Sequence, residues 1–322
     1  MTTVADPSDH PVAGVIIPLV TALDRHGRPD PPAVRPLLAH LAAGGVTTLM
    51  LAGTNGEGPL LPADAVRAYA GEVSAMWREL VGASARIMVT AAGIGTRETL
   101  RRMERLAGLD LDAVVVLAPS YFRHTERELH AHFRDAARHG RPVVIYNSPG
   151  YTGNPIPVSL VRRLLDEPAI VGLKDSSGNT ALFAEFCALA RERPAFQVAQ
   201  GTERQLAEGL RLGAAGLVPG VGMLAPALCV ELFRAGREAD HAAAAALQGD
   251  VDRLAALFAI RPGSSGIVVI KTALHELGLC PPHAAAPFLP FTESELAALR
   301  TALAPLHDLV RPDALQSARQ PE

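Results

Sequence analysis

Lysine is rare in this chain, and one lysine lies where it could do covalent chemistry. Lys174 and Lys271 are the only lysines among 30 lysine and arginine residues. Lys174 ends an apolar run in the segment AIVGLKDSSGN, residues 169–179. A neutral amine can form a Schiff base with a keto acid, whereas an arginine guanidinium stays protonated and cannot replace it. We expect Lys174 to be a partly desolvated nucleophile; a lysine that reaches solvent or pairs with Asp175 is the alternative.

Side chains with hydroxyl groups follow other apolar runs and could move the protons of such a reaction. Tyr146 comes after the run PVVI, one strand-and-helix unit before Lys174, and a phenol beside an amine can exchange a proton with it. Thr54 and Asn55 lie in the segment GTNGEG, whose backbone N–H groups and threonine hydroxyl could hold a small carboxylate. An ordinary buried tyrosine and a plain glycine-rich turn are the alternatives. For Lys271, in the helical pattern VVIKTALHELG, we expect a packing or helix-capping role.

The elements that must position these residues repeat along the chain. Short runs rich in Val, Ile and Leu begin at residues 14, 46, 86, 113, 142, 169, 196 and 216, and longer stretches with helical spacing lie between them. Continuous apolar strands that alternate with helices predict a parallel sheet covered on both faces. Eight such units predict an α/β fold of the (β/α)8 TIM-barrel type, with an open doubly wound sheet as the alternative. In a barrel the residues at the carboxyl ends of the strands meet at one mouth, which brings Tyr121 and Tyr151 beside Thr54, Tyr146 and Lys174.

The alternation ends near residue 224, and only helical patterns follow. We therefore expect a barrel over residues 13–223 and a C-terminal helical appendage over residues 224–310 that packs on the barrel. Residues 1–12 and 311–322 carry Pro and Asp and are expected to be loose tails.

Composition excludes several other classes of function. The net charge is −3 and the arginines are scattered, so the sequence predicts no nucleic-acid partner. Three widely spaced cysteines indicate free thiols in a reducing cytoplasm, and no apolar run is long enough for a membrane span. The histidines of HTERELHAHFRDAARH are expected on a solvated surface, and no glycine-rich nucleotide fingerprint is complete. We expect neither a metal nor a nucleotide cofactor.

Three motifs, in this order and spacing, carry a resemblance to a known family. The segments are GTNGE at 53–57, YNSPGYTG at 146–153 and GLKDSSG at 172–178. They resemble the corresponding motifs of the pyruvate-dependent class I aldolases of the dihydrodipicolinate synthase and N-acetylneuraminate lyase superfamily. The resemblance covers nearly the whole chain, from the first apolar run to the C-terminal helical patterns.

The resemblance implies roles for individual residues. Lys174 matches the Schiff-base lysine of the family, and Tyr146 matches the general acid/base beside it. Thr54 matches the hydroxyl of the proton relay, and Tyr121 matches a tyrosine that reaches into the active site of a neighbouring subunit, which implies a homodimer or homotetramer. The residues implied in substrate binding are Gly53, Asn55, Tyr151, Gly201 and Val218. The implied substrates are pyruvate, or another 2-keto acid, and an aldehyde.

One departure from the family bears on the substrate. The synthase branch carries an arginine that grips the carboxylate of the second substrate, and this chain has Tyr151 there. A tyrosine cannot replace an arginine in a carboxylate clamp. The segments GTNGE, with Asn55, and KDSSG favour instead an aldolase of the 4-hydroxy-2-oxoglutarate or 2-keto-3-deoxy sugar acid type. Ser148 and Val218 are expected to build the specificity pocket together with Tyr151. Dihydrodipicolinate synthase, a dehydratase that uses the same imine, a metal-dependent aldolase and a non-catalytic keto-acid-binding barrel are the alternatives.

Overall fold

The computed structural model describes residues 10–310, and these form a closed barrel of parallel strands. The strands follow one another around the barrel in chain order, and β1 closes it by pairing with β8. This arrangement confirms the predicted TIM barrel and excludes the open sheet. The strands are β1 (Gly14–Pro18), β2 (Thr48–Leu51), β3 (Arg86–Ala91), β4 (Ala113–Leu117), β5 (Val143–Asn147), β6 (Ile170–Asp175), β7 (Gln197–Gln200) and β8 (Gly216–Leu217).

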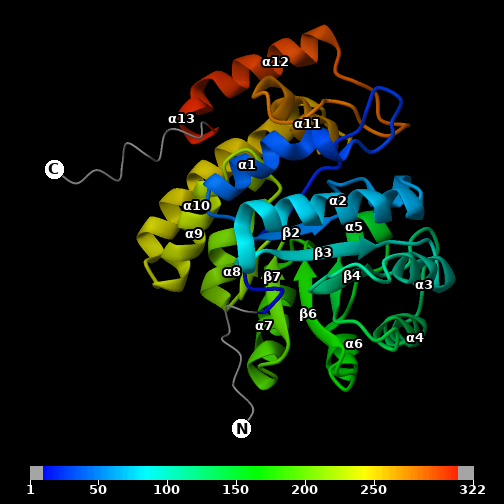
Figure 1. Ribbon diagram of the computed structural model, residues 1–322. Helices are drawn as coiled ribbons and strands as arrows, with labels where there is room; N and C mark the ends of the chain where they lie inside the picture. The colour runs from blue at the N-terminus through cyan, green and yellow to red at the C-terminus, as the bar shows by residue number, and fades with distance from the viewer. Residues whose placement is uncertain (1–9, 311–322) are drawn as a thin grey trace.

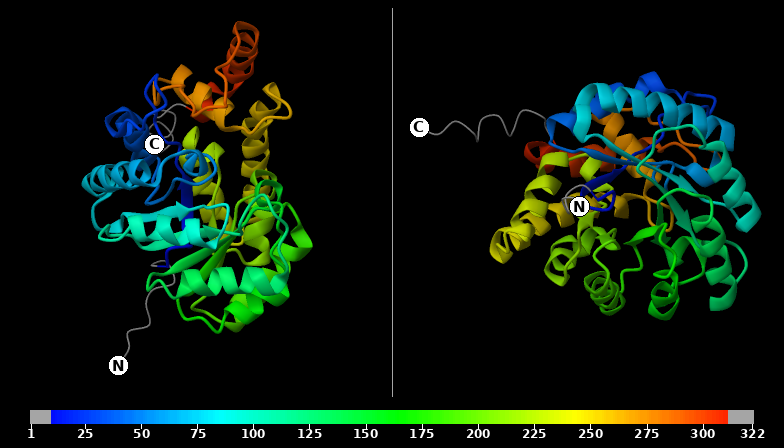
Figure 2. Two further views of the ribbon diagram at one scale, coloured as in Figure 1. Left: turned by 90° about the vertical axis from the view of Figure 1, so that its right-hand side faces the viewer. Right: turned by 60° about the horizontal axis from the view of Figure 1, so that its bottom comes forward.

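The helices wrap around the strands, as Figure 2 shows. They are α1 (Arg35–Ala43), α2 (Ala63–Val81), α3 (Thr96–Arg105), α4 (Glu126–Ala137), α5 (Pro149–Thr152), α6 (Val158–Leu164), α7 (Thr180–Glu192), α8 (Leu206–Leu212), α9 (Pro226–Arg237), α10 (His241–Ala255), α11 (Ile267–Glu276), α12 (Glu293–Leu303) and α13 (His307–Val310). Short 3-10 turns at Gly58–Leu60, Glu203–Gln205 and Ala256–Ile260 connect some of them.

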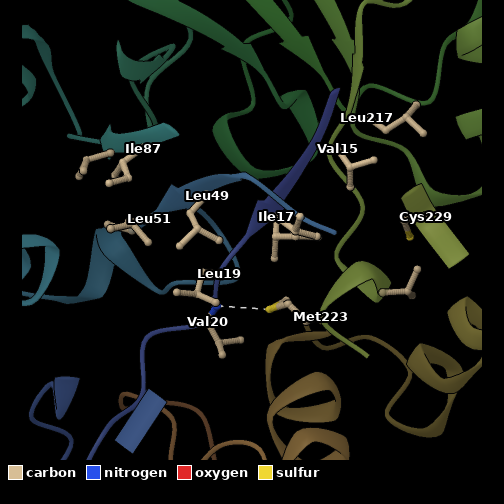
Figure 3. Close-up of a cluster of buried hydrophobic side chains, with 14 of the residues drawn as sticks. Val15, Ile17, Leu19, Val20, Leu49, Leu51, Ile87, Leu217, Met223 and Cys229 are labelled. Atoms are coloured by element: carbon tan, nitrogen blue, oxygen red, sulfur yellow. Dashed lines mark hydrogen bonds between the residues drawn. The ribbon is translucent and has the colours of Figure 1, made fainter. Parts of the chain in front are cut away.

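Alternation along the strands divides the apolar side chains into two clusters. On β5, Val143 and Ile145 face the helices, whereas Val144 and Tyr146 face the interior of the barrel. Successive side chains of a strand point to opposite faces, so the outward Leu173 on β6 implies that Lys174 points inward. Figure 3 shows part of the outer cluster, in which β1 and β2 pack against the segment that carries Met223. The pattern of the strands therefore aims Tyr146 and Lys174 at the same space.

The C-terminal helices lie against one side of the barrel (Figure 1). α10 contacts α9 and α8, and α12 contacts α11 and the turn at Ala256–Ile260. α9 itself contacts α8, α1 and β1, the position of the eighth helix of a barrel. The predicted boundary at residue 223 remains a prediction. Of the expected tails, residues 1–9 and 311–322 lie outside the described residues, and Val12 is buried in the interior of the barrel.

Candidate active site

Two neighbouring strands bring the candidate nucleophile and the candidate acid/base together. Tyr146 on β5 is in register with Lys174 on β6. The Nζ atom of Lys174 lies 4.1 Å from the centre of the Tyr146 ring. Both side chains are buried, with 5% of Lys174 and 3% of Tyr146 exposed. The amine is therefore buried over a phenol with which it can exchange a proton.

The environment of Tyr146 makes its hydroxyl more acidic than an ordinary phenol. Burial raises its pKa, but the positive charge of Lys174 and hydrogen bonds from Thr54, Ser148 and Ser176 lower it by more, to about 8. The Oγ1 atom of Thr54 lies 3.5 Å from the phenol oxygen. A phenol with a pKa this close to neutral can give and take a proton at little cost, which is the property that a general acid/base needs.

The Lys174 side chain has room because residue 201 is a glycine. A Cβ atom at Gly201 would lie 2.8 Å from Cε of Lys174, 3.0 Å from the carbonyl oxygen of Asp175 and closer still to Oγ of Ser176. Real Cβ atoms essentially never come this near to such neighbours. Gly201 therefore leaves the space that the amine occupies.

A cavity of about 270 Å³ opens in front of the amine. This volume suits a small acid better than a drug-sized ligand. Two of its lining residues, Asn55 and Gly220, lie close together: a Cβ atom at Gly220 would lie 3.0 Å from Nδ2 of Asn55. The lining residues are Pro18, Thr54, Asn55, Tyr146, Tyr151, Lys174, Ser176, Gly201, Glu203, Val218, Gly220, Phe258 and Gly266.

Glu203 is a residue of the cavity that the sequence analysis missed. It follows β7, two residues after Gly201. Its Oε1 atom accepts hydrogen bonds from the backbone N–H groups of Gly220 at 2.6 Å and Val221 at 3.3 Å, and its Oε2 atom is buried with no hydrogen-bond partner. Burial raises its pKa to about 7, although these two N–H groups and Lys174 act in the opposite direction. Its position after an apolar run was the signal that could have found it.

Most of the predicted site residues line the cavity around Lys174, and Gly53, Ser148 and Tyr121 do not. Gly53 is buried next to Thr54 in the chain, and Ser148 is buried and bonded to Tyr146. Tyr121 is 87% exposed and lies outside the cavity of its own chain. Its φ of +78° is the left-handed region, which is strained for an aromatic residue. Tyr151 lines the cavity, and its hydroxyl lies 3.3 Å from Oγ of Ser265.

A second, more apolar cavity of about 540 Å³ adjoins the first and shares Thr54 and Tyr151 with it. Ile94 in its lining, and Tyr121 and Phe122 directly after the lining residue Ser120, expose large apolar side chains. Exposed apolar residues that gather on one face are typical of surfaces that contact another protein.

Two expectations of the sequence analysis need correction. His132 of the histidine-rich segment is buried; it bonds the carbonyl of Leu117 and the hydroxyl of Thr96, and burial lowers its pKa to about 4. Lys271 does more than pack or cap a helix, because it forms a fully buried ion pair with Glu57. Over residues 10–310, no three His, Cys, Asp or Glu side chains are grouped closely enough to hold a metal ion. No helix in the same range is both long and apolar enough to cross a membrane.

Known proteins resemble this chain over most of its length. The model of the dihydrodipicolinate synthetase family matches residues 11–305. A 4-hydroxy-tetrahydrodipicolinate synthase from Corynebacterium aurimucosum is 31% identical over 91% of this chain and 92% of its own. An uncharacterized DapA-like lyase from Halobacterium salinarum is 30% identical over 91% of this chain and 93% of its own.

Solved structures agree with these relatives. The prophage protein YagE from E. coli K12, a member of the dihydrodipicolinic acid synthase family solved in complex with pyruvate, superposes with a TM-score of 0.84 at 28% identity. That alignment covers 91% of this chain and 98% of YagE. The dihydrodipicolinate synthase from Bacteroides thetaiotaomicron gives a TM-score of 0.84 at 29% identity, over 92% and 99% of the two chains. The chain with this lysine, phenol and hydroxyl at the mouth of its barrel belongs to the dihydrodipicolinate synthetase family and is a lyase of that family.

Proposed function

We propose that this protein is a class I aldolase that forms a Schiff base between Lys174 and pyruvate and makes or breaks a carbon–carbon bond to an aldehyde. The observation that carries the proposal is the buried Lys174 amine 4.1 Å from the ring of Tyr146, whose pKa is about 8. A barrel that only bound a keto acid would need neither a nucleophilic amine nor an acidic phenol beside it.

In the cleavage direction, the neutral amine of Lys174 adds to the C2 ketone of the substrate and water leaves, which gives an imine. The hydroxyl on C4 then loses its proton to a base, the C3–C4 bond breaks, and its electron pair moves into the protonated imine to form an enamine. An aldehyde departs. C3 of the enamine takes a proton, and water hydrolyses the resulting imine to pyruvate and the free amine.

The residues of this chain have distinct parts in these steps. The hydroxyl groups of Tyr146 and Thr54, whose oxygen atoms lie 3.5 Å apart, carry protons to and from the carbinolamine and the C4 oxygen. Asn55 and the backbone N–H groups of its loop hold the carboxylate of the keto acid. Tyr151, Gly201 and Val218 line the part of the cavity that receives the second substrate.

For the second substrate we propose the aldehyde that is released, with pyruvate, when 4-hydroxy-2-oxoglutarate or a 2-keto-3-deoxy sugar acid is cleaved. Tyr151 offers a hydroxyl, already bonded to Ser265, where a carboxylate clamp would need a cation. Glu203 lines the same cavity, and its protonated form, populated because its pKa is raised to about 7, offers a hydrogen-bond donor. Both groups suit a substrate with hydroxyl groups.

The names of the relatives favour a second candidate, 4-hydroxy-tetrahydrodipicolinate synthase. The two candidates share the imine and differ in the aldehyde. Incubation of the enzyme with pyruvate and a panel of aldehydes, followed by product identification, separates them. If 4-hydroxy-tetrahydrodipicolinate forms faster than the products of the other aldehydes in the panel, the protein is the synthase. A dehydratase would release no pyruvate from a keto-deoxy acid.

We also propose that the protein works in the cytoplasm as a homodimer or homotetramer. The exposed Tyr121, held at a strained φ of +78° against the ring of the exposed Phe122, supports insertion into the site of a second copy. Three buried cysteines without disulfides, Cys187, Cys229 and Cys280, fit a reducing compartment.

The test of the proposed function is the intact mass after borohydride reduction in the presence of pyruvate. We expect one reduced pyruvyl adduct per wild-type chain and none on Lys174→Ala. Absence of the adduct from the wild type, or its presence on Lys271, would refute the imine. Full activity after exhaustive dialysis against a chelator is expected, and loss that zinc restores would instead indicate a metal-dependent aldolase.

A further inference from the structure

The second lysine of the chain forms a buried ion pair that reaches the loop of the candidate active site. Lys271 lies in the middle of α11, and its Nζ atom contacts Oε1 of Glu57, the glutamate of the GTNGE loop. Neither side chain is exposed to solvent. The pair therefore joins the C-terminal helices to the loop that carries Thr54 and Asn55.

Both members of the pair are held by backbone groups of one further segment. Nζ of Lys271 donates a hydrogen bond of 2.7 Å to the carbonyl of His283, and Oε2 of Glu57 accepts one of 2.6 Å from the N–H of Ala285. The loop, α11 and residues 283–285 are thus linked by charge-assisted hydrogen bonds. Such bonds are stronger and more directional than those between neutral groups.

The loop needs such an anchor because its backbone is strained. Glu57 has φ of +58°, the left-handed region, which costs a residue with a side chain on the order of 1 kcal/mol. Glu57 N–H bonds the carbonyl of Thr54 and Gly58 N–H bonds that of Gly53, so the turn at residue 57 determines where Thr54 lies. A Cβ atom at Gly58 would overlap the carbonyl of Ala52, which leaves the loop little alternative space.

A role in stability alone explains this pair poorly. Buried ion pairs are often no more stable than apolar residues of the same volume, because desolvation offsets the attraction between the charges. Burial lowers the pKa of Lys271 here, whereas Glu57 acts to raise it. In some proteins a buried polar or ionic group instead fixes one arrangement among several that an apolar contact would allow. Both lysines of this chain then contribute to one site, Lys174 directly and Lys271 through Glu57.

We propose that Glu57 and Lys271 are positioning residues: their ion pair ties the keto-acid loop to α11 and holds Thr54 and Asn55 at the distance from Lys174 and Tyr146 that the reaction needs. The inference rests on the proposed function, since it concerns the same site. It assigns the C-terminal helices a part in catalysis although neither member of the pair lines the cavity around Lys174.

The test compares Glu57→Gln with a matched control. Asp112 forms a partly buried ion pair with Arg86 near the amino end of β3, and its Oδ2 atom also accepts a backbone N–H bond, from Ile87 at 2.7 Å. Asp112→Asn therefore repeats the same chemical change away from the cavity. Both variants keep the volume of the side chain and remove its charge.

The main measurement is the rate of borohydride trapping as a function of pyruvate concentration. Displacement of substrate-positioning groups by about 1 Å can cost about 100-fold, and we expect half-saturating pyruvate to rise about 10-fold or more in Glu57→Gln. A structural role would lower the fraction of active chains and leave half-saturation unchanged, as we expect for Asp112→Asn. Half-saturation within about twofold of wild type in Glu57→Gln would overturn the proposal.

Lys271→Met should show the same change, more strongly, because it leaves the Glu57 carboxylate buried without a counter-charge. Where that variant fails to fold, the double variant Glu57→Gln with Lys271→Met removes both charges and keeps the test. Hydrogen exchange of the peptide 53–61 provides a readout that does not depend on the imine. If wild type forms no adduct, the proposed function fails. If, in addition, the peptide 53–61 exchanges hydrogen at the same rate in Glu57→Gln and in Asp112→Asn, the anchoring role is refuted as well.

Discussion

Glu203 predicts a pH dependence that can be separated from those of the other groups in the cavity. Its pKa is raised to about 7, so its carboxyl group loses its charge as pH falls through neutrality. The ionised form places a negative charge beside Gly220, close to Asn55, which in the proposed reaction holds the carboxylate of the keto acid. We therefore expect the uncharged form to be the one that binds keto acid. Glu203→Gln mimics this form and keeps an oxygen that accepts the N–H of Gly220, 2.6 Å away in the native protein.

The size of the effect follows from the pKa. With a pKa of about 7, roughly nine-tenths of Glu203 is uncharged at pH 6 and roughly one-tenth at pH 8. If only the uncharged form binds pyruvate, the second-order rate constant of borohydride trapping in wild type, divided by that in Glu203→Gln, should fall about 10-fold from pH 6 to pH 8. Division by the rate constant of Glu203→Gln corrects for the pH dependence of borohydride itself and isolates the contribution of Glu203.

The same shift has a consequence for stability that serves as a control. Folded Glu203 holds its proton more tightly than an unfolded glutamate, so the native state binds more protons between about pH 4.5 and 7. The free energy of unfolding contributed by this group therefore falls as pH rises through that window. Glu203→Gln should flatten the pH dependence of Tm. A rate ratio that stays constant from pH 6 to pH 8, in a variant whose Tm profile has flattened, would refute the binding argument while leaving the pKa intact.

Three further variants test the geometry of the site. Gly201→Ala should slow formation of the pyruvyl adduct, because its Cβ atom would lie 2.8 Å from Cε of Lys174 and displace that side chain; an adduct at the wild-type rate would contradict this. Tyr146→Phe removes the phenol of pKa about 8 and should slow imine trapping by about 100-fold or more with half-saturation little changed. Tyr121→Ala should lower aldol cleavage and, in sedimentation, weaken self-association; unchanged kinetics would place Tyr121 outside every active site.

The fold could be predicted from the sequence because its signal is local and repeated. Each strand is a run of Val, Ile and Leu that needs cover on both faces, and the helical spacing between runs supplies that cover. The same periodicity placed Lys174 and Tyr146 at the ends of neighbouring strands, and the register between β5 and β6 bears this out. Residues that act where a strand ends are therefore accessible to sequence reasoning.

Residues whose role depends on distant partners were not accessible in this way. Lys271 lies in a stretch whose helical pattern is ordinary, and only the packing of α11 against the loop at residues 53–58 reveals its ion pair with Glu57. His132 lies in a helix rich in polar residues, yet its side chain is buried and forms hydrogen bonds with Leu117 and Thr96. In each case the partner comes from another element, and sequence spacing carries no information about it.

The charges around Lys174 suggest why one cavity needs two weak acids with shifted pKa values. The positive charge of Lys174 lowers the pKa of Tyr146 and acts to lower that of Glu203, yet burial leaves Glu203 at about 7. At neutral pH, Tyr146 is mostly protonated and Glu203 is about half ionised, so no full negative charge opposes an entering keto acid. In the proposed reaction, the substrate carboxylate then becomes the main counter-charge of the iminium. Tyr146 gives up and recovers protons without a large change in the net charge of the cavity. A stronger acid in place of either residue would stay ionised, hold Lys174 as an ion pair and repel the substrate, so the burial of these two acids is part of the chemistry.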